Sequence, residues 1–322
     1  MSRPILIYGA TGFTGRCCVR AAESRGVPYL VGGRNRAGLE AAAGPGCVGV
    51  RVADAADPGD AFEGVGCVIS TVGPFFRYGL PVLDAAIAAG AHYVDSTAEQ
   101  SFLKLALTRH DAAKSAGITA LPSSGVEYAP MFLAAAMLGE GPVDTYLWLD
   151  DFLPTRGSVR SMIAMAGVGP TPRPFVVTFE ERRGAAIQIP GAEEILIHPN
   201  SRTYLMLRRR EALPFAAVWP IARWFPPSDA LADWVASQVT DPTDEQCAQA
   251  RFTAVVVRGD QAMRIDGRDV YGSTGRFCVS LAELLVDGHA ESAGVLATGA
   301  ALDPASTLSH LGLSARRLDG FA

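Results

Sequence analysis

Three glycines near the start of the chain constrain its fold more than any other feature of the sequence. In the stretch ILIYGATGFTGR, Gly9, Gly12 and Gly15 separate residues 5–8, an apolar run that predicts a strand, from residues 14–25, which predict a helix. Glycine allows a positive φ and a close approach of backbone to a ligand. The N-terminus of the following helix offers free N–H groups and the positive end of its dipole. This order of elements predicts a site for a phosphate-bearing ligand.

The same turn carries two hydroxyl side chains, Thr11 and Thr14, which we expect to donate hydrogen bonds to a pyrophosphate. The alternative interpretation is that the small residues only let the helix pack closely on the strand. Because the motif directly follows a predicted strand and precedes a predicted helix, its context favours dinucleotide binding.

The pattern of apolar and polar residues divides the rest of the chain into two parts. Up to about Pro122, short β-branched runs alternate with longer alanine-rich segments, which is typical of βαβ units. Beyond Gly125, apolar and polar residues alternate between glycine and proline breaks, which indicates antiparallel strands with one covered face. We therefore predict an α/β chain with a Rossmann-type doubly wound parallel sheet in residues 1–125, an α+β substrate and dimerisation domain with a mostly antiparallel sheet in 126–271, and a C-terminal helical segment, 272–322, that packs back on the first domain.

The predicted elements of the first domain are short. The strands are expected at residues 5–8, 29–32, 46–52, 67–72, 92–95 and 118–121, and the helices at 14–25, 81–89 and 102–116.

Composition excludes several classes of function. The net charge of −5 argues against a nucleic-acid partner, which usually requires a basic excess. The six cysteines form no CxxC and the five histidines no paired spacing, so we expect neither a metal site nor a disulfide framework. No segment reaches the roughly 18 to 20 apolar residues that a membrane span needs, and no leader is recognisable at the start. The sequence therefore predicts a reduced, cytoplasmic protein.

The end of the second predicted strand distinguishes between two cofactors. NAD-binding folds usually place an acid there for the ribose 2′-hydroxyl, whereas the 2′-phosphate of NADP calls for a cation. The sequence LVGGRNR has no acid, and Arg34 is followed by Asn35. Because a guanidinium presents a planar fork to phosphate oxygens, we predict NADP rather than an ordinary exposed loop arginine. Asp54, after the third strand, is either a carboxylate for the adenine amino group or a helix N-cap for the residues that follow.

The segment after the fourth strand, STVGPFFRYGLP at residues 70–81, is predicted to be a loop. In an open parallel sheet, ligands lie beyond the carboxyl ends of the strands. We expect Thr71, Val72, Gly73 and Pro74 beside the pyrophosphate and nicotinamide, with Phe75, Phe76 and Tyr78 either as apolar walls or as plain packing.

Three sequence segments together are more specific than the glycine motif alone. YGATGFTGR, GGR and VGPFFRYGLPVLDAAIAAGAHYVDSTAEQSF resemble the NADP-binding domain of the saccharopine dehydrogenase-like family, in the branch of trans-acting enoyl reductases and saccharopine dehydrogenase-like oxidoreductases. The resemblance is dense over residues 4–130 and weaker beyond. It implies a two-domain NADP-dependent oxidoreductase that passes hydride between nicotinamide and a C=N, C=C or C=O bond in a cleft between domains. Carried over by position are the phosphate turn (Gly9, Thr11, Gly12, Phe13, Thr14, Gly15), the 2′-phosphate contact Arg34, and the nicotinamide-side residues Val72, Gly73 and Pro74.

Reduction by NADPH also needs a proton donor near the nicotinamide. The candidates at the carboxyl edge of the sheet are Tyr78, Asp95, Glu99 and Tyr128, of which we assign Tyr128 and Tyr78 as catalytic candidates. The alternative for Tyr128 is a phenol packed at the domain hinge, and the resemblance implies that Asp95 stabilises its loop. In SSGVEYAPMFLAA, Glu127 and Tyr128 replace the family's commoner pattern, which leaves the substrate open.

The leading hypothesis is an NADP-dependent reductase of an imine or activated alkene, acting on a small or acyl-type molecule, for example in secondary metabolism. One alternative is a catalytically silent NADP-binding scaffold that contacts partners, and another is an epimerase or lyase that uses NADP transiently. The apolar stretch 211–227 is interpreted as buried core, as a lid, or as a contact with a membrane surface or a partner protein. A homodimer is an open alternative for the assembly.

Overall fold

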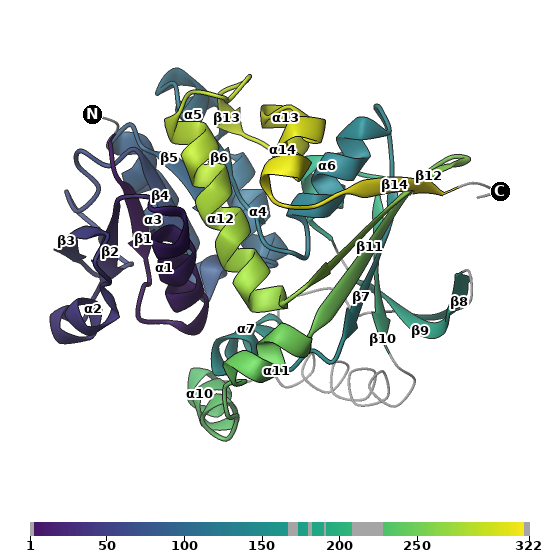
Figure 1. Cartoon of the computed structure of the whole chain (residues 1–322), viewed down its shortest axis with the longest axis horizontal. Helices are drawn as coiled ribbons and strands as arrows, with labels where there is room; N and C mark the ends of the chain where they lie inside the picture. The colour runs from purple at the N-terminus through teal and green to yellow at the C-terminus, as the bar shows by residue number, and fades with distance from the viewer. Residues whose placement is uncertain (1–2, 167–172, 180–181, 190, 208–227, 319–322) are drawn as a thin grey trace. The chain divides into compact units, whose positions relative to one another are not determined.

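The computed structural model describes residues 3–166, 173–179, 182–189, 191–207 and 228–318, so the apolar stretch 211–227 lies outside the described residues. The chain forms two compact units, each built from two segments (Figure 1). Unit 1 comprises Met1–Leu133 and Tyr271–Gly312, and unit 2 comprises Ala134–Val270 and Leu313–Ala322.

Unit 1 contains a seven-stranded sheet whose strands are all parallel, in the order β13-β6-β5-β4-β1-β2-β3. The chain moves outward from β1 on both sides, so the predicted doubly wound parallel sheet is confirmed. Ligands of such sheets bind where the order reverses, here between β1 and β4. The strands are β1 (Ile5–Tyr8), β2 (Tyr29–Gly33), β3 (Cys47–Val52), β4 (Cys67–Ser70), β5 (His92–Asp95), β6 (Thr119–Leu121) and β13 (Gly294–Val295).

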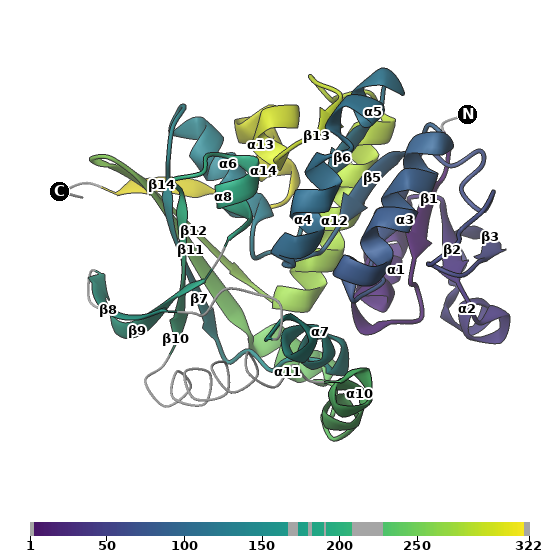
Figure 2. The same cartoon turned by 180° about the vertical axis from the view of Figure 1, so that it is seen from behind.

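Helices cover both faces of this sheet: α1 and α12 lie on one face, and α3 and α4 on the other (Figures 1 and 2). The helices of unit 1 are α1 (Phe13–Arg25), α2 (Arg36–Ala42), α3 (Phe75–Ala88), α4 (Gln100–Leu107), α5 (His110–Ser115), α12 (Val270–Val286), α13 (Thr298–Ala301) and α14 (Pro304–His310). A Cβ on Gly275 of α12 would lie 2.6 Å from the carbonyl carbon of Cys17. Glycine therefore allows α12 to pack directly on the backbone of α1.

The prediction of a loop over residues 70–81 is wrong from Phe75 onward. Helix α3 begins at Phe75 and contains Pro81, whose missing N–H removes only one hydrogen bond of the helix. The helix can begin so early because the carboxylate of Glu99 accepts hydrogen bonds from its first amides. The helix predicted over 102–116 is also interrupted: α4 ends at Leu107 and α5 begins at His110.

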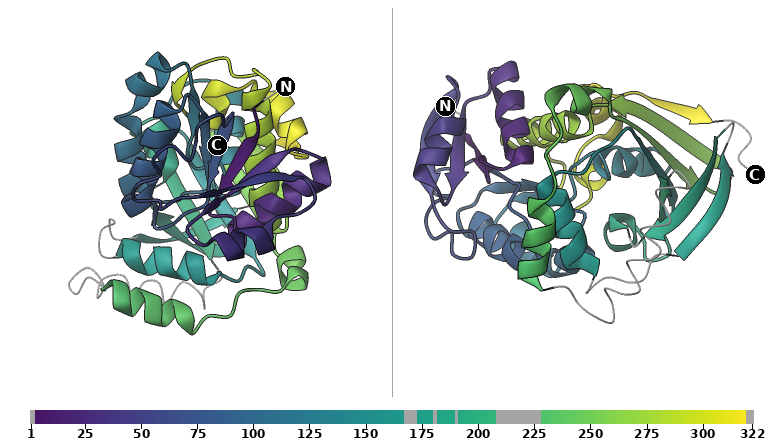
Figure 3. Two further views of the ribbon diagram at one scale, coloured as in Figure 1. Left: turned by 90° about the vertical axis from the view of Figure 1, so that its left-hand side faces the viewer. Right: turned by 90° about the horizontal axis from the view of Figure 1, so that it is seen from below.

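Unit 2 contains a second seven-stranded sheet in the order β14-β12-β11-β7-β10-β9-β8 (Figure 3). Among the described strands of this sheet, β7 and β10 alone pair in parallel, so the mostly antiparallel sheet is confirmed. Its strands are β7 (Asp144–Asp150), β8 (Arg173–Phe179), β9 (Arg182–Ile189), β10 (Arg202–Leu207), β11 (Arg251–Arg258), β12 (Gln261–Arg268) and β14 (Ala315–Leu318).

The helices of unit 2 include a packed pair, α7 (Arg156–Ala166) and α10 (Asp229–Ser237), which run side by side (Figure 3). Arg160 and Asp233 form an ion pair between them. The shorter helices are α8 (Ala192–Leu196) and α11 (Asp244–Gln249). The sequence boundary between unit 1 and unit 2, after Leu133, falls inside α6 (Ala129–Met137). Within the described residues, no helix combines the length and the hydropathy needed to cross a membrane.

Candidate functional site

Two of the three glycines in the turn after β1 are required by packing. Gly9 has a φ of +94°, and a Cβ there would lie 2.6 Å from Oγ1 of Thr71. The Thr71 hydroxyl lies 3.2 Å from the carbonyl oxygens of both Tyr8 and Gly9, to which it can donate, so the end of β4 is fixed against the turn. A Cβ on Gly15 would lie 2.2 Å from the Gly9 carbonyl oxygen. For Gly9 and Gly15, the interpretation as close packing therefore has a direct steric basis.

Gly12 differs from the other two glycines because the space beside it is open. Among the described residues, and apart from its chain neighbours, the atom that an added Cβ would meet within 4 Å is the Gly9 carbonyl oxygen, at 3.3 Å. Gly12 is also the N-cap of α1, which has no side-chain cap and no acidic residue in its first turn. A helix start of this kind leaves its first N–H groups free for an anion. The turn therefore fits a pyrophosphate, which would occupy the space that a side chain on Gly12 would fill.

Arg16 brings a positive charge to this turn that the sequence analysis missed. Its guanidinium donates to the carbonyl oxygen of Thr11 at 2.6 Å and lies 5.7 Å from the centre of the Phe13 ring. The Phe13 ring packs edge to face on Tyr271 of α12, with ring centres 5.0 Å apart. Phe13 thus joins α1 to α12 by its side chain, while Thr11 is exposed and Thr14 partly exposed. The only sequence signal for Arg16 was its place directly after the third glycine.

The ends of β2 and β3 bring Arg34 and Asp54 to the same region. Burial, assisted by the Asp54 carboxylate and opposed by Arg34, raises the pKa of Tyr8 to about 12. The Tyr8 hydroxyl donates to the Ala53 carbonyl oxygen at 3.0 Å. Arg34 is exposed, and none of the described residues forms a hydrogen bond or ion pair with its side chain. A guanidinium available at the end of β2 is suited to a phosphate.

The neighbours of Arg34 also have local roles. Asn35 is the N-cap of α2, where its side-chain oxygen accepts from the Gly38 amide at 3.2 Å. Asp54 accepts from the Ala56 amide at 2.9 Å, which closes a turn after β3. The alternative of a helix N-cap at Asp54 is wrong, because the residues after β3 form a turn and not a helix.

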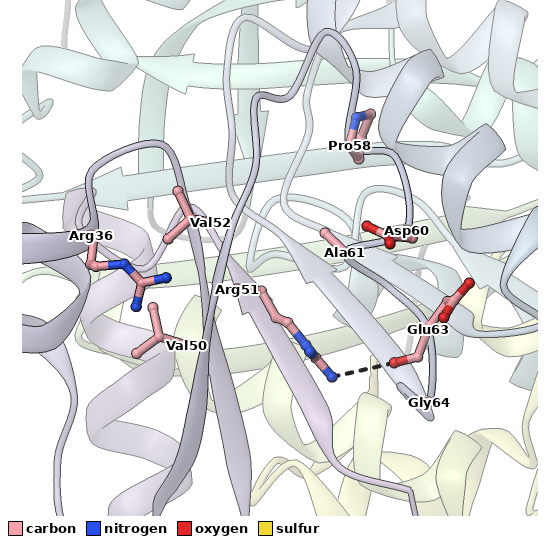
Figure 4. Close-up of a pocket in the computed structure, with 9 residues that line it drawn as sticks. All are labelled: Arg36, Val50, Arg51, Val52, Pro58, Asp60, Ala61, Glu63 and Gly64. Carbon is pink, nitrogen blue, oxygen red and sulfur yellow. Dashed lines mark hydrogen bonds between the residues drawn. The ribbon is translucent and has the colours of Figure 1, made fainter.

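An open cavity of about 570 Å³ lies beside β3 and extends to Arg36 of α2 (Figure 4). Its walls combine apolar and charged side chains: Arg36, Val50, Arg51, Val52, Pro58, Asp60, Ala61, Glu63 and Gly64. The guanidinium of Arg51 donates to the Glu63 carbonyl oxygen at 3.5 Å across it. The cavity is thus bordered by the same two segments that carry Arg34 and Asp54.

On the other side of the glycine turn, residues 71–74 link β4 to α3. Thr71, Val72 and Gly73 are partly exposed, and Pro74 is buried. At the start of α3, the Phe75 amide donates to Oε1 of Glu99 at 3.0 Å, and the Phe76 amide donates to Oε2 at 2.8 Å. A protein carboxylate therefore already occupies the N-terminus of α3, unlike that of α1.

Asp95, at the end of β5, is completely buried and connects the segments that follow β5 and β6. Its Oδ1 accepts from the amides of Thr97 and Ser123, each at 2.9 Å. Burial raises the pKa of Asp95 to about 7, against the lowering effect of these hydrogen bonds. This arrangement matches the loop-stabilising role that the resemblance implied for it.

The two tyrosines assigned as catalytic candidates lie in packed surroundings. Tyr128 is 3% exposed, and its ring stacks on Phe132 with ring centres 5.9 Å apart. Tyr78 lies inside α3 rather than in a loop, and packs against the core between the sheet and its helices. Beside Tyr128, Glu127 is partly exposed, and burial raises the pKa of its carboxyl group. In the part of the chain that the structure describes, no three metal-ligating side chains form a cluster.

The structure therefore brings together two groups of the predicted residues. Thr71 contacts the glycine turn, and Arg34 and Asp54 flank one hydroxyl group at the ends of β2 and β3. The residues that the sequence analysis missed, or to which it gave another role, are Arg16, Tyr8 and Glu99. Tyr8 and Glu99 act through partners 45 and 23 to 24 positions away in the sequence, which no local motif reveals.

Comparison with known proteins supports the sequence resemblance. Residues 5–121 match the family model described as the saccharopine dehydrogenase NADP binding domain. The human saccharopine dehydrogenase-like oxidoreductase is 30% identical over 149 residues, which cover 39% of this chain and 35% of that protein. The trans-acting enoyl reductase of Mycobacterium leprae is 32% identical over 137 residues, covering 39% of this chain and 33% of that protein.

These matches have a limited extent. The chain aligns with about a third of the length of the relatives that it matches. Apo saccharopine dehydrogenase (L-Glu forming) of Saccharomyces cerevisiae aligns over 98% of this chain and 100% of that chain, with a TM-score of 0.59 and 12% identity. At this identity the likeness shows a shared fold. The resemblance stated from the motifs is confirmed for residues 5–121, and the fold class is confirmed for the chain.

Proposed function

We propose that this chain, whose residues 5–121 resemble the saccharopine dehydrogenase NADP-binding domain, is an NADP-dependent oxidoreductase. The observation that carries the proposal is the pairing of an open, uncapped α1 N-terminus at Gly12 with an exposed arginine at the end of β2. The first feature suits a pyrophosphate, and the second suits the 2′-phosphate that distinguishes NADP from NAD.

Each part of the cofactor has a proposed set of contacts. The amides at the start of α1, together with Thr11, Thr14 and Arg16, balance the charge of the pyrophosphate. Arg34 and Asn35 hold the 2′-phosphate, and Asp54 accepts from the adenine amino group. The apolar walls of the cavity beside β3 have room for the adenine ring. Thr71, Val72, Gly73 and Pro74 form the wall on the nicotinamide side.

NADPH, when bound, supplies the hydride for reduction. The chain's own residues must then position the substrate and deliver a proton to the atom that does not receive hydride. We propose Tyr128 or Tyr78 as the proton donor, and the Glu127 carboxyl group as a further candidate, because burial makes it hold its proton to higher pH. The bond reduced is proposed to be a C=N or an activated C=C bond of a small or acyl-type molecule, in line with the names of the relatives.

A second candidate function is that of an NADP-binding scaffold without turnover. It is favoured by one observation, the burial of Tyr128 and its stacking on Phe132, which separates that phenol from solvent. Turnover assays distinguish the two functions: NADPH oxidation with cyclic imines or α,β-unsaturated acyl thioesters supports the reductase. Tight NADPH binding with no oxidation by either class supports the scaffold.

Cofactor choice is tested with Arg34→Ala. We expect the wild-type chain to bind NADPH more tightly than NADH, and the variant to lose roughly 10- to 100-fold of NADPH affinity, as expected for lost hydrogen bonds to a charged group. NADH affinity should stay the same. Fluorescence titration measures both.

The matched control is Arg3→Ala. Arg3 is exposed and lies just before the start of β1, whereas the glycine turn follows the end of β1. It should leave both affinities unchanged. Equal binding of NADPH and NADH by the wild-type chain would contradict the NADP assignment.

A further inference from the structure

The N-terminus of α3 is held by a buried carboxylate from the next βα connection. Glu99 is 2% exposed, and its two oxygens accept from the amides of Phe75 and Phe76 at 3.0 and 2.8 Å. Both bonds join an N–H donor to a carboxylate, which makes them stronger than bonds between neutral groups. Since α3 begins directly after residues 71–74, the carboxylate fixes the point at which that segment ends.

The other end of the same segment is fixed as well. The Thr71 amide donates to the Tyr8 carbonyl oxygen at 2.9 Å, and its hydroxyl contacts the backbone of the glycine turn. Only Val72, Gly73 and Pro74 lie between these two attachments. The path of the segment therefore depends on both the glycine turn and Glu99.

Glu99 is itself held in place by a chain of buried polar groups. Its amide donates to Oγ1 of Thr97 at 3.0 Å, and the Thr97 amide donates to Oδ1 of Asp95 at 2.9 Å. Thr97 is 2% exposed and Asp95 is fully buried. The Glu99 carbonyl oxygen also accepts from the Leu103 amide at 3.1 Å, the first hydrogen bond of α4. The carboxylate is thus anchored to the end of β5 and to the start of α4.

The arrangement separates the two halves of the proposed cofactor site. Arg34, Asn35 and Asp54, proposed for the adenosine half, lie at the ends of β2 and β3. The segment that Glu99 fixes lies at the end of β4, on the other side of β1. The hydrogen bonds of Glu99 to Phe75, Phe76, Thr97 and Leu103 all lie in the segments that follow β4 and β5.

We propose that Glu99 is a positioning residue for the nicotinamide half of the cofactor site: it sets the path of residues 71–74 through the two amides at the start of α3. This inference rests on the proposed NADP-dependent function. Glu99 acts through the backbone of α3, and not by contact with the reacting atoms.

The test compares a whole cofactor with half of one. Glu99→Gln keeps the size of the side chain but replaces one acceptor oxygen with an NH₂ group, which cannot accept from an α3 amide. NADPH affinity should fall about tenfold, the size expected for one lost charge-assisted hydrogen bond. The affinity for adenosine 2′,5′-bisphosphate, which lacks the nicotinamide half, should stay the same. Isothermal titration calorimetry measures both ligands.

Two variants serve as controls. Arg34→Ala should weaken NADPH and adenosine 2′,5′-bisphosphate by the same factor, since both contain the 2′-phosphate. Glu291→Gln, at an exposed carboxylate of unit 1 between α12 and β13, should change neither affinity.

A second route remains if Glu99→Gln fails to fold. Thr97→Val removes the hydroxyl that orients Glu99. It should lower the affinity for NADPH and leave the affinity for adenosine 2′,5′-bisphosphate unchanged, as expected for Glu99→Gln. Parallel changes for the two ligands, or no change for either, in the folded variant would overturn the positioning role. If the wild-type chain bound neither ligand, the proposed function itself would fail, and this inference with it.

Discussion

At the scale of single residues, two glycines of the same turn have different roles. Gly15 lets α1 start against the Gly9 carbonyl oxygen, which a Cβ would approach to 2.2 Å. Gly12 faces open space apart from one contact at 3.3 Å. Gly15 is therefore expected to matter for folding, and Gly12 for ligand binding.

This difference predicts opposite results for two alanine variants. Gly15→Ala forces backbone apart and should lower the free energy of unfolding by about 1–3 kcal/mol, as overpacking does. Gly12→Ala should lower it by less than about 1 kcal/mol, yet remove most NADPH binding, because its methyl group fills the space proposed for the pyrophosphate. Urea unfolding and NADPH titration measure the two effects. Equal destabilisation by both variants would contradict this division.

At the scale of elements, buried carboxylates connect helices to strands. Glu193 of α8 is fully buried, and its oxygens accept from the hydroxyls of Thr145 in β7 at 2.9 Å and of Thr203 in β10 at 2.6 Å. These are the two strands that pair in parallel in the second sheet. A Cβ on Gly191 would lie 1.6 Å from Oγ1 of Thr203, so the approach of α8 also requires a glycine.

Removing the Glu193 carboxylate should therefore destabilise unit 2. Glu193→Ala removes the acceptor of the buried Thr203 hydroxyl and the closer of two acceptors of Thr145, whose hydroxyl also lies 3.4 Å from the Arg202 carbonyl oxygen. With the cavity that it creates, we expect this change to lower the free energy of unfolding by about 2–4 kcal/mol. Glu194→Ala is the matched control, because the neighbouring side chain is exposed, and it should change stability by less than about 0.5 kcal/mol. Chemical denaturation followed by circular dichroism measures both. Similar losses in the two variants would show that α8 is held by other contacts.

At the scale of the whole molecule, the buried titratable groups determine how stability depends on pH. Burial raises the pKa of Asp95 to about 7 and also raises the pKa values of Glu127 and Glu193. The folded state then binds more protons than the unfolded state between the ordinary carboxyl pKa and the raised one. Burial lowers the pKa of His92. At pH values just below the ordinary histidine pKa, the folded state therefore binds fewer protons at His92 than the unfolded state, so His92 opposes the effect of the carboxyl groups there. Stability should therefore be highest at mildly acidic pH.

The expected measurement is a fall in the free energy of unfolding as the pH rises from about 5 to 8, a range that spans the raised pKa of Asp95. Asp95→Asn keeps a side-chain acceptor for the Thr97 and Ser123 amides without a charge, so its decline over the same range should be smaller than that of the wild-type chain. Urea titrations at a series of pH values measure both curves. A variant curve parallel to that of the wild type would show that Asp95 contributes nothing to the decline.

The sequence predicted what depends on local pattern and missed what depends on distant partners. β1 and β5 have the predicted bounds, because apolar β-branched runs between turn residues are local signals. The start of α3 depends on Glu99, 23 to 24 residues away in the sequence, and was predicted as loop. The glycine turn and Arg34 were recognisable as a candidate site, whereas the cation at Arg16 and the Tyr8 hydrogen bond became visible only with the fold.

The contact of Gly275 with the backbone of Cys17 has a consequence for how the chain folds during its synthesis. Helix α1 is made before unit 2, but the helix that covers it is made only after nearly all of unit 2. Unit 2 in turn receives its last strand, β14, after unit 1 has been completed. Neither unit can reach its final form before part of the other has been made, so one face of the first sheet remains without α12 until residues 134–269 have been synthesised.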